Sequence, residues 1–196
     1  MTNRTHVVLS YVVLGAIVNG SHSWQHFSWV SIGLFGVFET AEMINLGRYF
    51  YWLVMTCQLQ VIFSVVVMAY SNCDVFEDAY RKSGPVLYTI GNFTMHYLPS
   101  LIMRGMATSD HIHCGNEKCV QQVCLAFGLY LVWYFFEDPI LVYGCTLPSV
   151  FGVFGALAID VCVLCVALIS QRQSKSLHQN HGGSDTHFIF NWQYFF

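Results

Sequence analysis

One histidine lies inside an apolar stretch of this chain, where ionisable side chains are rare. It is His96 in YTIGNFTMHYLPSLIMRG, residues 88–105, and Asn92 and Thr94 precede it by four and two positions. Because a titratable group inside a membrane helix is costly, such a residue indicates a functional site by default. A neutral histidine that hydrogen-bonds to a neighbouring helix is the alternative.

A histidine that acts as a base needs a nucleophile within hydrogen-bonding distance. Serine and threonine side chains in the other apolar segments are the candidates: Ser28, Ser31, Thr40, Thr56 and Ser64. Hydroxyls in helices usually donate to a carbonyl group one turn earlier, so each of these also has an ordinary structural explanation. Only a hydroxyl at the membrane depth of His96 could act with it, and sequence spacing does not choose among them.

Acidic side chains in apolar segments form a second set of candidates. Asp160 falls near the middle of SVFGVFGALAIDVCVLCVALIS, where it could orient a histidine or pair with another polar group. Glu39 and Glu42 lie near the end of an earlier apolar segment. We expect both at the membrane edge, with Glu39 facing the interior of the bundle.

Histidine and cysteine also gather in the polar segment HIHCGNEKC, which contains His111, His113, Cys114 and Cys119. The segment lacks the paired C-x2–4-C and H-x3–5-H spacing of structural zinc sites, so a solvated loop is the favoured interpretation. A C-x-x-C pair, Cys162 and Cys165, lies in an apolar run, which favours helix packing over redox chemistry. No metal or other cofactor is expected.

The elements that must hold these residues are membrane helices. Of 196 residues, 55% are hydrophobic and 10% charged, whereas soluble domains carry about 25% charged residues. A net charge of -3 without a basic run argues against nucleic-acid binding. Six segments meet or approach the roughly 20 apolar residues of a membrane helix: 6–19, 27–46, 50–70, 86–104, 120–136 and 148–170. The sequence therefore predicts an all-α, polytopic transmembrane helix bundle of six helices in one domain, 1–170, followed by a cytosolic tail, 171–196.

The positions of lysine and arginine predict the orientation of this bundle. If both termini are cytosolic, six cationic residues lie on the cytosolic side: Arg4, Arg48, Arg104, Lys118, Arg172 and Lys175. Only Arg81 and Lys82 lie on the other side, as the positive-inside rule requires. Segment 6–19 is expected to be the first helix rather than a cleaved signal peptide. We expect a multi-pass protein of the endoplasmic reticulum or plasma membrane, and its oligomeric state is left open.

The order of these motifs resembles that of the androgen-induced and androgen-dependent TFPI-regulating membrane proteins, a family of atypical threonine hydrolases. NFTMH and the following Leu98-Pro99 are similar to the family's Asn-His-x-x-His motif, whose catalytic histidine corresponds to His96. SWQHFS is similar to the family's Ser-Trp-x-x-x-Thr stretch, whose nucleophilic threonine corresponds to Ser28. The likeness rests on short motifs and covers most of residues 7–170.

The resemblance implies hydrolysis of fatty acid esters of hydroxy fatty acids, with the lipid entering from the bilayer. Ser28 would be the nucleophile and His96 the base, and three polar residues would support them: Asn92, Thr94 and Asp160. The family's first histidine is Phe93 here, and its acidic residue three positions after the nucleophile is Ser31. The rival hypothesis is a non-catalytic membrane protein, either an accessory subunit or a small transporter in which His96 and Asp160 line a polar path.

Overall fold

Every regular element in the described part of the chain is a helix. The structure is a computed structural model that describes residues 27–42, 44, 46–70, 74–107, 109–112, 114–136 and 149–180. Its elements are α2 (Phe27–Glu42), the 3-10 helix η2 (Gly47–Tyr49), α3 (Tyr51–Tyr70), α4 (Asp74–His96), α5 (Leu98–Met106), α6 (Ser109–Ile112), α7 (Asn116–Phe136) and α9 (Ser149–Asn180). The predicted all-α class is confirmed.

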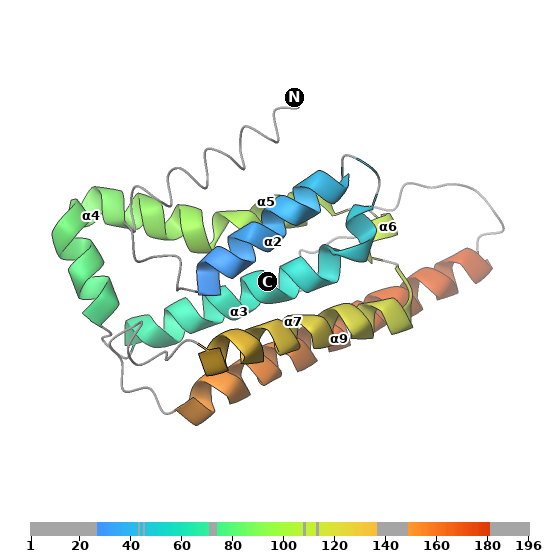
Figure 1. Ribbon diagram of the computed structural model, residues 1–196. Helices are drawn as coiled ribbons and strands as arrows, with labels where there is room; N and C mark the ends of the chain where they lie inside the picture. The colour runs from blue at the N-terminus through green and yellow to red at the C-terminus, as the bar shows by residue number, and fades with distance from the viewer. Residues whose placement is uncertain are drawn as a thin grey trace.

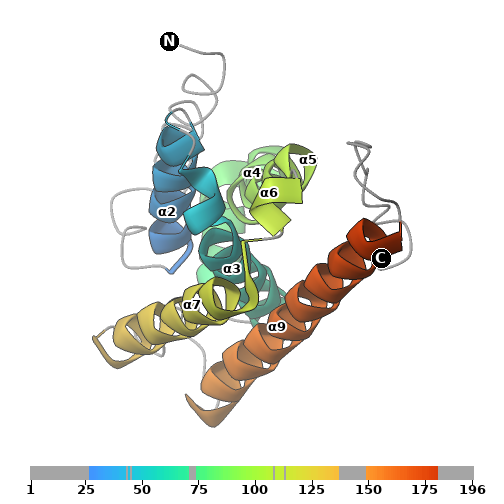
Figure 2. The ribbon, with the colours of Figure 1, turned by 90° about the vertical axis from the view of Figure 1, so that its right-hand side faces the viewer.

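Helix α3 forms the centre of the bundle. It packs against α2, α4, α5, α6, α7 and α9, and Figures 1 and 2 show these helices arranged around it. Three described helices are long and apolar enough to cross a membrane, over Tyr51–Met68, Asn116–Phe136 and Gly152–Arg172. Within these spans 67% of α3 is buried by protein, against 28% of α7 and 22% of α9, so the two outer helices leave wide apolar faces for lipid.

The inner face of α9 is a stripe of small and polar residues. The buried positions Ala156, Asp160, Val163 and Ala167 recur every three or four residues, which is the period of one helix face. Gly155 lies beside this stripe, and a Cβ atom there would overlap the Phe63 ring of α3. Small side chains therefore let α9 approach the centre of the bundle closely.

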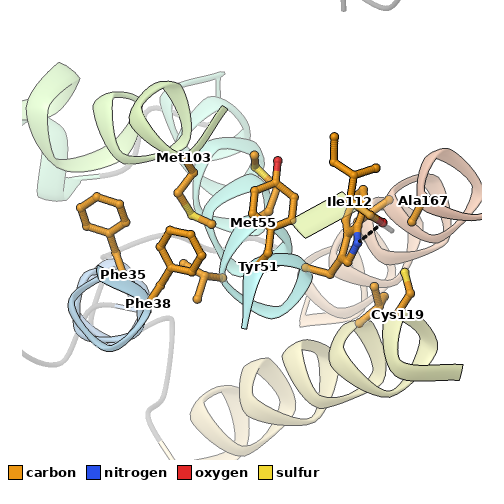
Figure 3. Close-up of a cluster of buried hydrophobic side chains, with 12 residues drawn as sticks. Phe35, Phe38, Tyr51, Met55, Met103, Ile112, Cys119 and Ala167 are labelled. Carbon is orange, nitrogen blue, oxygen red and sulfur yellow. Dashed lines mark hydrogen bonds between the residues drawn. The ribbon is translucent and has the colours of Figure 1, made fainter. Parts of the chain in front are cut away.

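Two apolar clusters fill the interior on either side of Asp160. One joins α2, α3, α5, α6, α7 and α9, and Figure 3 shows Phe35 and Phe38 of α2 facing Tyr51 of α3 and Met103 of α5. The other joins α3, α7 and α9 through residues that include Val61, Tyr130 and Ala156. Because Asp160 lies between Ala156 and Val163 on one helix face, it lies between the two clusters.

The predicted span 86–104 is not one straight helix. Helix α4 starts already at Asp74 and is bent at Gly84, whose φ of 74° and ψ of 166° are not helical, directly before Pro85 (Figure 1). It ends at His96, and α5 begins at Leu98 after the turn residue Tyr97. The charged residues 74–84, which lie between the predicted spans 50–70 and 86–104, are therefore mostly helical.

The other predicted spans are close to the observed helices. Spans 50–70 and 120–136 correspond to α3 and α7, whereas span 27–46 ends earlier, at Glu42, where the chain turns into η2. Helix α9 begins at Ser149 as expected but continues to Asn180, ten residues past the predicted end at 170. Span 6–19 lies outside the described residues.

Candidate functional site

His96 is the last residue of α4, next to the break between α4 and α5. The break has a covalent cause: Pro99 has no N–H group, so the Met95 carbonyl loses the donor that would continue the helix. Non-helical backbone inside a membrane protein is tolerated where it faces protein or a polar site. The break therefore places the half-buried His96 at the end of a helix rather than in the middle of a continuous one.

The orientation of the His96 ring is fixed by Asn92, one helical turn earlier. Nδ1 of His96 lies 2.6 Å from the side-chain oxygen of Asn92 and 3.1 Å from its backbone carbonyl oxygen. A carbonyl oxygen only accepts hydrogen bonds, so Nδ1 carries the proton and donates it. In the neutral ring the lone pair is then on Nε2, the tautomer that a base acting through Nε2 requires.

The two residues between Asn92 and His96 that the sequence singled out belong to other faces of α4. Phe93 is 48% exposed and stacks on Tyr97, with ring centroids 6.1 Å apart. Thr94 is half-buried and lies two positions from His96, so the two side chains do not share a helix face. The structure therefore groups Asn92, not Thr94, with the histidine.

Several candidate nucleophiles have the structural role expected of helix hydroxyls. Thr40 donates to the Gly36 carbonyl at 2.9 Å, and Thr56 donates to the Trp52 carbonyl at 2.6 Å. Ser64 is a hydrogen-bond partner of the Tyr130 side chain. These three hydroxyls are engaged within the fold, which leaves the serines of α2.

Ser28 and Ser31 are buried and share one face of α2, because they are three residues apart. The Ser31 carbonyl accepts a hydrogen bond of 3.2 Å from Nε2 of Gln58 in α3. Among the described residues, the Ser31 hydroxyl and the Gln58 side-chain oxygen are buried without a hydrogen-bond partner. The start of α2 thus presents two serine hydroxyls to a polar part of the interior, and α2 packs against both α3 and α4.

Asp160 is paired with a polar side chain of the central helix. Its Oδ1 accepts a hydrogen bond of 2.7 Å from Nε2 of Gln60, and only 4% of Asp160 and 1% of Gln60 are exposed. The sequence left two roles open for Asp160, orientation of a histidine or pairing with another polar group. In the structure Asp160 pairs with Gln60. The described supporting residues are therefore divided between two places: Asn92 beside His96, and Asp160 between α9 and α3.

A second polar centre, at the other end of α2, was not predicted from the sequence. Nε2 of His111 lies 2.7 Å from a carboxylate oxygen of Glu42, and the His111 ring stacks on Tyr51 at a centroid distance of 5.6 Å. The prediction of a solvated loop is wrong here, because His111 and Ile112 are buried in α6. The hydrogen bond to Glu42 and the stacked Tyr51 ring explain that burial. Glu39 is buried, as expected.

The cysteines do not form a metal centre in the described part of the chain, where no three histidine, cysteine or acidic side chains come together; His113 lies outside that part. Burial raises the pKa of the Cys114 thiol, and Gln122 and Lys118 offset part of this effect.

Cys162 and Cys165 are exposed on the outer face of α9, so the prediction that they pack between helices is wrong. Asp160 and Val163 occupy the packed face instead.

Cationic residues from distant parts of the sequence meet at the end of the bundle that holds Glu42 and His111. The Arg48 guanidinium and the Lys118 ammonium lie 5.0 and 4.7 Å from the centre of the Tyr49 ring. Arg81 is on the first limb of α4, where it pairs with Glu77.

Comparison of the chain with models of protein families, with curated proteins and with solved structures finds no match.

Proposed function

We propose that the protein is an integral membrane lipid ester hydrolase, in which Ser28 is the nucleophile and His96 the general base. The observation that carries the proposal is the contact of His96 Nδ1 with two acceptor oxygens of Asn92, at 2.6 and 3.1 Å. A base that donates from one ring nitrogen to a fixed acceptor and carries its lone pair on the other nitrogen is the arrangement that nucleophilic hydrolases use. Asn92 is a positioning residue in this mechanism.

The reaction follows from these two groups. His96 Nε2 takes the proton of the Ser28 hydroxyl while Oγ attacks the ester carbonyl carbon. The ester C–O bond breaks, His96 returns the proton to the departing alkoxide, and the acyl group remains on Ser28. Water then attacks the acyl-enzyme with His96 again as base, which releases the fatty acid and restores the serine.

The surroundings favour a lipid substrate over a water-soluble one. The chain is a bundle of apolar helices whose outer members, α7 and α9, are buried by protein over only 28% and 22% of their spans, so an ester with two acyl chains could enter sideways from the bilayer. Fatty acid esters of hydroxy fatty acids have this form. The cationic cluster of Arg48 and Lys118 supports a cytosolic location for its end of the bundle. The membrane would be that of the endoplasmic reticulum or the cell surface.

A fluorophosphonate probe on the full-length protein in detergent tests the proposal. We expect covalent labelling of the wild type, loss of labelling in Ser28→Ala and His96→Ala, and retention in Ser28→Thr, which keeps the hydroxyl. Loss of general-base assistance should lower ester turnover by about 10²- to 10⁴-fold in His96→Ala. Thermal melts of each variant separate loss of chemistry from loss of folding.

Ser31→Ala is the matched control, because Ser31 is a buried hydroxyl on the same face of α2. Labelling that persists in Ser28→Ala but disappears in Ser31→Ala would transfer the nucleophile to Ser31. Absence of both labelling and turnover in the folded wild type would overturn the hydrolase proposal and favour an accessory subunit or small transporter.

A further inference from the structure

Asp160 and Gln60 lie in the middle of the bundle, where each has one oxygen atom that no described residue contacts by a hydrogen bond. The hydrogen bond between them uses Asp160 Oδ1 and Gln60 Nε2. Among the described residues, Asp160 Oδ2 and Gln60 Oε1 are buried and accept no hydrogen bond. Buried polar atoms are normally satisfied, so two adjacent unsatisfied acceptors indicate that something with a positive charge or a proton belongs there.

No cationic side chain in the described part of the chain neutralises Asp160. The Arg81–Glu77 and His111–Glu42 contacts both lie away from Asp160. An isolated carboxylate between two apolar clusters would be strongly disfavoured, because the low dielectric of the interior penalises an unpaired charge. The carboxyl group must therefore hold either a proton or a bound cation.

The backbone around the pair favours the proton. A metal cation would need several further oxygen ligands, which membrane proteins usually supply from unwound helices. Helices α3 and α9 are continuous through Gln60 and Asp160, so their carbonyl groups are used in helical hydrogen bonds. A proton needs only one oxygen.

Glutamine suits both protonation states of its partner. Its N–H group can donate to a carboxylate, and its carbonyl oxygen can accept from a carboxylic acid after the amide turns over. Lysine or arginine at position 60 could only donate and would hold Asp160 in the charged form. Gln60 thus allows the carboxyl group to change its protonation state without losing its hydrogen bond.

We propose that Asp160 is a proton-binding site in the membrane interior, at which the carboxyl group takes up and releases a proton while Gln60 remains bonded to it. The site is separate from Ser28 and His96 and does not depend on the hydrolase proposal. The titratable group of α3 that interacts with Asp160 is the buried Cys57 thiol. On α7 the buried titratable groups are Cys119 and Tyr130, which pack in the two apolar clusters.

Dicyclohexylcarbodiimide, which reacts with protonated carboxyl groups in membranes, tests the site in the full-length protein reconstituted into lipid vesicles. The acid adds to the carbodiimide as an O-acylisourea, which rearranges to a stable N-acylurea, and peptide mass spectrometry locates it. We expect Asp160 to be labelled, with labelling falling about tenfold per pH unit above the titration midpoint. Glu117, exposed in the first turn of α7, is the internal control and should stay unlabelled.

Two variants of Gln60 test the role of the amide. Gln60→Lys should abolish labelling, because the ammonium group holds Asp160 ionised. Gln60→Leu should remain labelled at a pH at which the wild type no longer reacts, because the carboxylate has lost its donor. Asp160→Asn, which resembles the neutral acid, should melt at the wild-type temperature, and a much lower melting temperature would mean that the charged form is the native one.

Labelling of Asp160 that is absent at every pH, or that does not change with pH, overturns the proposal. Protection by sodium ions at constant pH and ionic strength would also overturn it, since it would identify a metal cation as the occupant. None of these results depends on ester turnover, so the hydrolase proposal and the proton site succeed or fail separately.

Discussion

The side-chain oxygen of Asn92 lies 2.6 Å from Nδ1 of His96 across one turn of α4. This contact, with the Asn92 carbonyl oxygen at 3.1 Å, fixes which nitrogen of the imidazole carries the proton. A glutamine or asparagine near a histidine is often treated as a donor. Here the backbone acceptor on the same nitrogen removes that ambiguity, because a carbonyl oxygen cannot donate.

Replacement of Asn92 by leucine should therefore weaken catalysis in the proposed hydrolase without preventing folding. The His96 ring loses one of its two acceptors, which should lower kcat about tenfold. KM should change little, because Asn92 acts through His96 in the proposed mechanism. Steady-state ester turnover measures both constants. Asn92→Asp is the control that keeps an acceptor oxygen and should stay active; a fully active Asn92→Leu would contradict the positioning role.

The Glu42–His111 pair should contribute strongly to stability. His111→Ala leaves a carboxylate that is 17% exposed without its partner and removes a ring that packs on Tyr51, so we expect a loss of about 3 kcal/mol. The thermal unfolding midpoint in detergent, followed by circular dichroism, checks this. Glu42→Gln, which keeps an acceptor for the imidazole N–H, should lose less; equal melting of His111→Ala and wild type would show that the pair is not stabilising.

Gly47 gives an independent way to disturb the same pair. A Cβ atom at this position would overlap the carboxyl group of Glu42, so Gly47→Ala must push that side chain away from His111. We expect Gly47→Ala to lower the melting temperature in the wild type but to have little additional effect in a His111→Ala background. Additive effects in this double-mutant cycle would show that the glycine acts through something other than the Glu42–His111 contact.

The sequence predicted the helices that are apolar throughout and missed features that depend on tertiary contacts. Spans 50–70 and 120–136 are long apolar runs, and they correspond closely to α3 and α7. The first limb of α4 is charged, so it belongs to none of the predicted apolar spans. The break at Tyr97 follows from Pro99, a signal that was present within a predicted span but could not by itself give the position of His96.

The polar centres were the hardest features to predict. Glu42 and His111 are 69 residues apart, and Gln60 and Asp160 are 100 residues apart, so only the packing of the helices pairs them. The Asn92–His96 pair is different, because four residues separate them and one helical turn brings them together. Local pairs can be inferred from helical spacing, whereas pairs between helices need the fold.

Cys114 should react slowly with thiol reagents at neutral pH. Burial raises the pKa of its thiol, which leaves less of the reactive thiolate than a free cysteine has. We expect the alkylation rate by a maleimide to be lower than that of glutathione at pH 7 and to rise about tenfold per pH unit below the thiol pKa. Mass spectrometry of the Cys114 peptide measures the rate; a rate equal to that of glutathione would contradict the burial.

Gln122 should be required for the start of α3. Its side-chain oxygen accepts hydrogen bonds from the backbone N–H groups of Trp52 at 3.0 Å and Leu53 at 3.3 Å, which have no partner within their own helix. A side chain of α7 therefore caps the central helix of the bundle. Gln122→Leu would leave both buried donors unsatisfied and should destabilise the fold by roughly 2 kcal/mol, measured as a lower unfolding midpoint in detergent. Gln122→Glu keeps the acceptor and adds a negative charge at a helix N-terminus, so it should melt well above Gln122→Leu. If both variants lose the same stability, the loss comes from packing around position 122 and the capping role is wrong.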